Sequence, residues 1–287
     1  NVTNMYGMFA GASSFNGNIT SWDVSSVTDM DYMFNNAEAF NQNISAWNVS
    51  NVNSMLGTFE DTIVFDQNIG SWDVSSVTNM RNMFNKARDF NQNINSWDVS
   101  SVTNMSYMFG SNANVDVLFN QPLSSWNVSN VTDMEGMFIQ AESFNQPIDN
   151  WDVSSVTNMM RMFNSTELFD QPLNSWDVSS VTDMRFMFDR TAAFDQNIGS
   201  WDVSNVISMG MMFTYAKLFN QDISSWDVSS VINMSDMFNQ NINDPSPNGF
   251  NQDLSSWSVA GVTNCNRFSL NAFQYTSAKP SFTNCTP

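Results

Sequence analysis

Seven aspartates, each directly after a tryptophan, carry the side chains of this chain best suited to chemistry. A row of carboxylates can attract a positively charged ligand or bind a hard cation such as Ca²⁺. Closely spaced carboxylates also repel one another, unless hydrogen bonds from neighbouring serines, asparagines or backbone amides compensate. Both interpretations of the row stay open from the sequence. The seven residues are Asp23, Asp73, Asp98, Asp152, Asp177, Asp202 and Asp227.

The rest of the composition argues against an enzyme. The chain has 287 residues, a net charge of −19 and no histidine, the commonest catalytic base. No base is available to activate the many serines of the W-D-V-S-S segments. Every repeat offers the same aspartate, so no pair is singled out as acid and nucleophile. Nine lysines and arginines give no basic patch for nucleic acid. We therefore expect no enzymatic activity and no nucleic-acid partner.

Ten tryptophans mark the repeat that must position these aspartates. Seven of the nine steps between them are 25 residues long, and the other two are 29 and 31. A fixed period in this range is typical of a solenoid, in which each repeat packs only on its neighbours. The longer steps place insertions at 110–118 and 239–249, which are either binding loops or neutral drift.

Two hydrophobic spacings within each repeat predict its secondary structure. The alternation over Trp47–Val49 predicts a short strand whose middle residue points outward. The spacing of three to four over Val27–Ala37 predicts a short amphipathic helical segment. Together they predict an α/β, leucine-rich-repeat-like solenoid of about 10–11 coils, with the aspartates on its concave sheet. The runner-up is a parallel β-helix, which the helical spacing disfavours.

The repeat F-N-Q-x-I-x-x-W-D-V-S-S-V-T-x-M-x-x-M-F resembles that of the BspA-like leucine-rich repeat family of surface proteins. The resemblance extends over residues 1 to about 268. It implies a secreted or cell-surface protein, with adhesion as its suspected role and no known enzymatic activity. It transfers no binding residues.

We therefore expect a non-enzymatic extracellular protein that binds a protein or glycan ligand through an acidic concave face. One alternative is a structural subunit of an extracellular fibre, appendage or surface coat, whose partners are copies of itself. The other is an acidic Ca²⁺-binding module, and otherwise no cofactor is expected. No stretch is long and apolar enough to span a membrane.

The repeats predict a solenoid over residues 1–264 and a cap over 265–287. Because the chain begins inside a repeat, we expect an excerpt of a longer protein. Cys265 takes the position that methionine holds in earlier repeats, so it should point inward. A disulfide to Cys285 would close a loop and contribute about 3 kcal/mol. The alternative is two buried free thiols.

Two further patterns accompany the aspartates. The asparagine or aspartate of F-N-Q, from Asn16 to Asn251, should bond the backbone of the next coil. Arg81, Arg161 and Arg185 follow the repeat methionine and should lie away from the acidic row. In a eukaryotic secreted chain, a subset of the N-x-S/T sequons would carry glycans, Asn164 above all. The candidate sequons are Asn18, Asn48, Asn104, Asn127, Asn164 and Asn233.

Overall fold

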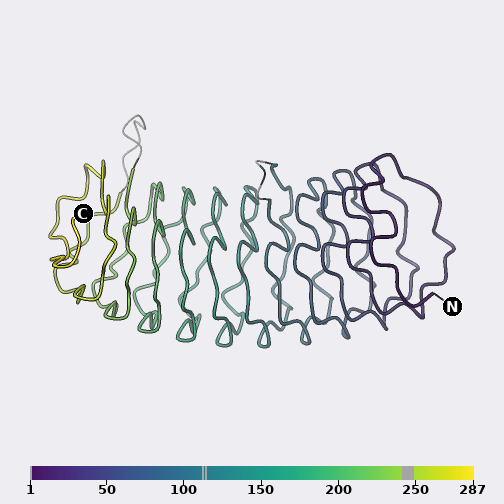
Figure 1. Cartoon of the computed structure of the whole chain (residues 1–287), viewed down its shortest axis with the longest axis horizontal. Coiled ribbons are helices and arrows are strands. Elements are labelled where there is room, and N and C mark those ends of the chain that lie inside the picture. Colours follow the sequence, from purple (N-terminus) through teal and green to yellow (C-terminus); the bar gives the residue numbers. More distant parts are fainter. Residues whose placement is uncertain (1, 112, 114, 241–248) are drawn as a thin grey trace.

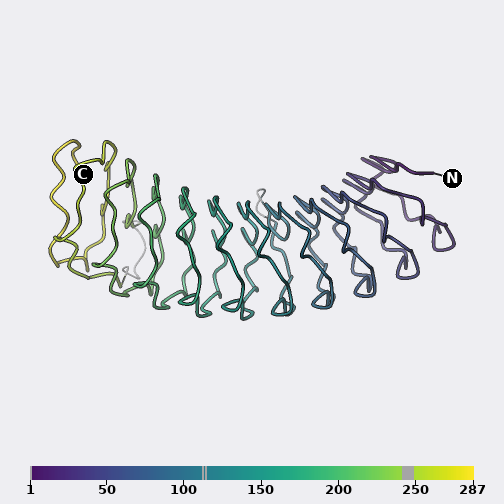
Figure 2. The same cartoon turned by 90° about the horizontal axis from the view of Figure 1, so that it is seen from below.

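The computed structural model is an elongated stack of coils that runs from the N-terminus at one end to the C-terminus at the other (Figure 1). It describes residues 2–111, 113, 115–240 and 249–287, so most of the second insertion and part of the first lie outside the described residues. The described residues contain no helix and no extended strand. Their regular pairing is one parallel β-bridge between each coil and the next. Figure 2 shows that the stack bows along its length.

The bridges define the coils, which we number from bridge to bridge. The first bridge joins Asn4 to Asp29 and the last joins Asn233 to Asn264. The ten coils are residues 5–29, 30–54, 55–79, 80–104, 105–133, 134–158, 159–183, 184–208, 209–233 and 234–264.

The predicted helical segment is wrong: a run of turns takes its place. In coil 4 the backbone N–H of Met83 donates to the carbonyl of Met80 at 3.1 Å, and that of Ala87 donates to Phe84 at 3.0 Å. These are contacts between residues three apart, whereas an α-helix bonds residues four apart. The third residue of each turn, Asn82 or Lys86, has a φ of 56° or 58°. A positive φ at that position fits a type II turn and stops a right-handed helix.

Hydrogen bonds between coils explain why turns replace the helix. The backbone N–H groups of Asn82 and Phe84 donate to Ser106 and Met108 in the next coil, both at 2.9 Å. Alternate N–H groups therefore join the coils, and those between them close the turns. An α-helix would direct its N–H groups beyond the first turn to carbonyls of its own coil, so fewer would be left to join the coils. The α/β class and the leucine-rich-repeat solenoid are thus incorrect for this chain.

The predicted strand at W-D-V is also absent. In coil 4, Trp97 and Val99 point into the core and Asp98 points out, as the alternation indicates. However, turns flank the segment, because Trp97 donates its backbone N–H to Ile94 and Val102 donates to Val99. The bridging residue is Asn104, at the end of the V-T-N segment. A single bridge per coil does not make the sheets of the alternative β-helix either.

The core is made of columns of identical residue types. Isoleucine or leucine, tryptophan, valine, methionine, phenylalanine and alanine recur at the same place in successive coils, and nearly all are buried. The phenylalanines form two stacked columns: Phe84 lies 4.0 Å from Phe90 in its own coil and 5.8 Å from Phe109 in the next, between ring centroids. Each ring therefore contacts several others, a large buried aromatic area per coil.

The F-N-Q side chains join the coils along a second line. The Oδ1 atom of Asn41 accepts the backbone N–H of Asp66 at 3.1 Å and the Nε2 of Gln67 at 2.8 Å. Asp66 in turn accepts from Asn91 and Gln92. Only one oxygen is needed, so aspartate and asparagine serve equally well. The predicted structural role of this ladder is confirmed.

Residues 265–287 follow the last bridge and pack against coil 10. Cys265 is fully buried and forms a disulfide with Cys285, with the two Cα atoms 5.8 Å apart. The backbone N–H of Thr276 donates to the Oδ1 of Asn251, the last member of the F-N-Q ladder. The predicted disulfide and the inward orientation of Cys265 are confirmed.

Candidate functional site

Each aspartate of the acidic row, the seven that follow tryptophan, occupies an exposed turn with the same geometry. In coil 6, the Oδ1 atom of Asp152 accepts the backbone N–H of Ser154 at 3.1 Å and its hydroxyl at 2.6 Å. In every coil of the row, the serine two positions after the aspartate donates its backbone N–H to the carboxylate in the same way. Asn48 and Asn127 take this place in coils 2 and 5 and bond Ser50 and Ser129 alike. Intramolecular hydrogen bonds therefore satisfy one oxygen of each carboxylate.

These bonds keep the row ionised. The hydroxyl of Ser154, followed by its backbone N–H, lowers the pKa of Asp152, and the equivalent serine lowers the pKa of the other six. Neighbouring carboxylates act weakly in the opposite direction: Asp177 and Asp227 raise the pKa of Asp202. Repulsion along the row is felt, but the serines outweigh it.

Cations of the M-x-x-M-F turn run pair with carboxylates outside the acidic row. Arg185 pairs with Asp183 at 2.6 Å and Lys86 with Asp61 at 3.8 Å. None of the ion pairs found among the described residues involves an aspartate of the acidic row. The row thus presents uncompensated negative charge.

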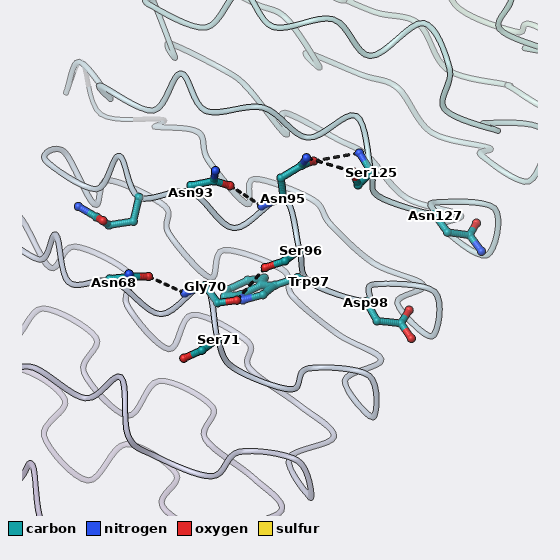
Figure 3. A pocket seen from close by; sticks show the side chains of 11 residues that line it. Asn68, Gly70, Ser71, Asn93, Asn95, Ser96, Trp97, Asp98, Ser125 and Asn127 are labelled. Atoms are coloured by element: carbon teal, nitrogen blue, oxygen red, sulfur yellow. Dashed lines mark hydrogen bonds between the residues drawn. The ribbon is translucent and has the colours of Figure 1, made fainter.

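A polar hollow of about 830 Å³ opens beside this row over coils 3 to 5 (Figure 3). Its wall includes Asp98 and Asn127 of the W-D-V-S turns, with Asn68 and Asn93 on the other side. Gly70 lies between them, where coils 2 and 4 carry serine and asparagine. A Cβ atom on Gly70 would meet the carbonyl oxygen of Asn93 at 2.5 Å, so this backbone approach requires glycine.

Hydrogen bonds fix the side chains that line the hollow. Asn68 and Asn93 accept the backbone N–H groups of Gly70 and Asn95 through Oδ1, at 3.0 and 2.9 Å. Asn95 also bridges to the next coil, accepting from Ser125 and donating to its hydroxyl. The site is therefore built before any ligand arrives.

The sequons divide into two groups by the use of their amide nitrogen. Asn104, Asn164 and Asn233 donate it to a side chain of a neighbouring coil, Asn164 to Asp189 at 2.8 Å. Asn18, Asn48 and Asn127 are exposed. The Oδ1 atom of each accepts the backbone N–H of the residue two positions later in the chain. The amide of Asn164 is thus engaged between coils, while these three face outward.

The second question about the acidic row is whether it could hold a metal ion. In the parts of the chain that the structure describes, no three acidic or cysteine side chains converge on a point that could hold a metal ion. The acidic row has at most one carboxylate in each coil, so its members do not form a cage of the kind that Ca²⁺ prefers.

Sequence reasoning missed two features. The first is the hollow, whose one signal, Gly70, is weak because Gly199 holds the same place in coil 8. The second is Asp189, which is 9% exposed and whose pKa burial raises to about 7. Asparagine holds the same place in coils 2, 4, 7 and 10, so the aspartate in coil 8 was the available signal.

The repeats of this chain match a known protein family. One family matches the chain in four overlapping segments, residues 1–77, 55–173, 111–218 and 191–284, and is described as "Mycoplasma protein of unknown function, DUF285". The chain belongs to this family. The overlapping matches show that DUF285 is a repeat family here, without confirming the BspA-like assignment. A search of curated proteins found no match. Across the described residues of this DUF285 chain, no helix has the length and hydrophobicity to cross a membrane.

Proposed function

We propose that this DUF285 chain is a non-enzymatic binding domain of a secreted or cell-surface protein, which holds a positively charged partner on its acidic row. The observation that carries the proposal is the repeated W-D-V-S turn. In seven of the ten coils it presents one ionised carboxylate at the surface, each fixed by a serine.

The geometry suits a ligand with repeating positive charge. The serine bonds use Oδ1, and the described residues supply no donor to the second oxygen of Asp152, Asp177 or Asp202. That oxygen is free to accept from a lysine or arginine of a partner. Fixing the acceptors in advance lowers the ordering cost of binding, and an acidic surface speeds encounter with a basic partner.

Two observations support an extracellular location. The Cys265–Cys285 disulfide fits an oxidising compartment. The W-D-V-S-S-V-T repeat resembles that of BspA-like surface proteins, a family suspected of adhesion. No catalytic role is proposed, because seven coils repeat the same aspartate without a distinct acid or base beside it.

A fluorescent deca-lysine peptide tests the acidic row. We expect saturable binding that weakens between low and physiological salt, since exposed charges are screened over about 8 Å at 0.15 M. The triple variant Asp152→Asn, Asp177→Asn, Asp202→Asn keeps each serine bond and leaves the hollow untouched. At about 0.5 kcal/mol for each lost ion pair, it should raise Kd about ten-fold.

The matched control removes the same charge from another line. Asp66, Asp170 and Asp195 belong to the F-N-Q ladder, where asparagine already serves in other coils. Their conversion to asparagine should change Kd much less. Equal losses in the two triple variants would mean that net charge, and not the acidic row, governs binding.

A further inference from the structure

The hollow over coils 3 to 5 differs in chemistry from the acidic row that borders it. Its lining offers the side chains of asparagine, glutamine and serine, and its one charged group is Asp98. Trp97 contributes at its floor but is only 2% exposed. A ligand that fits this lining carries little charge, no large apolar group and many groups that both donate and accept hydrogen bonds.

We propose that this hollow binds a neutral glycan chain. Sugar hydroxyls both donate and accept hydrogen bonds, and amide side chains provide both functions in one group. This binding needs no positive charge on the ligand, so it goes beyond the proposed function of the acidic row and does not depend on it.

Free hydrogen-bonding groups face the hollow from both sides. Asn68, Asn93 and Asn127 use Oδ1 within their own turns, at 3.0, 2.9 and 3.2 Å, which leaves three amide NH₂ groups as donors. Gln92 donates its Nε2 to Asp66 at 2.9 Å, which leaves Oε1 as an acceptor. The second carboxylate oxygen of Asp98 is a further acceptor, since only Oδ1 holds Ser100.

Some of these groups also repeat along the stack of coils, as a bound polysaccharide chain would require. Asn68 and Asn93 hold the same place in coils 3 and 4, about 4.8 Å apart as in paired strands, a spacing that suits consecutive sugar rings, while Asn127 of coil 5 faces them from the other side. Because intramolecular bonds already fix these side chains, little side-chain entropy is lost on binding. At Gly70 the backbones of coils 3 and 4 come close together, since a Cβ atom there would lie 2.5 Å from the carbonyl oxygen of Asn93.

The substitution Asn127→Asp tests the site without a change of fold. Aspartate holds the equivalent place in seven other coils and caps the serine in the same way. The substitution replaces an amide donor of the hollow by a carboxylate beside Asp98. Asn48→Asp is the matched control, because Asn48 occupies the same turn in coil 2 and does not line the hollow.

Affinity electrophoresis in native gels suits the weak binding expected of a polar surface. The four gels contain hydroxyethylcellulose, glucomannan, soluble starch or laminarin, all neutral polysaccharides. We expect at least one to retard the chain, with an apparent Kd that rises about five-fold in Asn127→Asp, the loss of about one hydrogen bond. Asn48→Asp should match the parent, and raising the salt to 0.3 M should not abolish retardation.

Three results would overturn the proposal: retardation in none of the four gels, equal weakening by both substitutions, or loss of retardation in 0.3 M salt. The last would assign binding to charge. The triple variant at Asp152, Asp177 and Asp202 separates the two proposals, since it weakens deca-lysine binding and should leave glycan retardation unchanged.

Discussion

The indole nitrogen of Trp97 donates a hydrogen bond to the carbonyl oxygen of Ile69, one coil earlier, at 3.1 Å. The same oxygen accepts the backbone N–H of Trp72, which closes a turn in its own coil. The other tryptophans from Trp47 to Trp257 repeat the indole bond. The tryptophan period is therefore also a period of hydrogen bonds between coils.

Replacing Trp97 by phenylalanine should lower the free energy of unfolding by about 1–2 kcal/mol. The substitution removes the indole donor and part of the buried ring. Urea unfolding followed by circular dichroism measures the loss. Trp22→Phe is the control, because Trp22 is 37% exposed and its indole reaches no acceptor among the described residues. Equal losses in the two variants would show that the inter-coil bond contributes nothing.

Gly136→Ala should destabilise the stack by about 1–3 kcal/mol through overpacking. Gly136 has a φ of +55°, and a Cβ atom there would lie 2.6 Å from the ring of Tyr107 in the preceding coil. Because the clash is with one side chain, Tyr107→Ala in the same chain should recover part of the loss. In Gly7→Ala the new Cβ atom would meet nothing closer than 3.7 Å. This substitution should therefore lower the free energy of unfolding only by the strain of a left-handed backbone, about 1 kcal/mol. A double variant no more stable than the sum of the singles would refute this coupling.

Asp189→Asn should stabilise the protein at pH 8 and have little effect at pH 4. Burial raises the pKa of Asp189 from 3.8 to about 7, so between these values the folded chain holds a proton that the unfolded chain has released. The stability due to the neutral carboxyl is full below pH 3.8 and is lost as the pH rises through 7. Urea midpoints at the two pH values measure the effect. Asp177→Asn gives the comparison of opposite sign, because Ser179 lowers the pKa of Asp177.

Reduction of the Cys265–Cys285 disulfide should lower the melting temperature of the C-terminal end of the stack. A cross-link over 20 residues contributes about 3 kcal/mol in the chain-entropy account. Differential scanning calorimetry with and without dithiothreitol measures the shift. A double variant with alanine at both cysteines should melt like the reduced parent and ignore the reductant. An unchanged melting temperature in the parent would show that the cap does not limit stability.

The sequence predicts which side chains face inward, but not the backbone that places them there. Met80, Met83, Phe84 and Ala87 share a face in a helix and also in a run of turns, so their spacing cannot distinguish the two. The deciding quantity is the positive φ that recurs every fourth residue. Glycine or asparagine at that position, as in Gly57, signals it in only some coils.

The candidate site was predictable to a similar degree. That Asp98 points outward follows from the inward orientation of its two neighbours, and its bond to Ser100 was one of two alternatives. The hollow was not predictable, because it depends on how Gly70 of one coil approaches Asn93 of the next. That contact requires the backbone path of both coils.

Asparagine and aspartate replace one another at the W-D-V-S and F-N-Q turns, so the charge at these turns can change while the turn keeps its hydrogen bond. Either residue supplies the single Oδ1 acceptor that each turn requires, as Asn48 and Asp73 both do. One nucleotide change in a codon can therefore add or remove a carboxylate without disturbing the stack. The number of negative charges on the surface can therefore vary from coil to coil while the hydrogen bonds that hold these turns are kept.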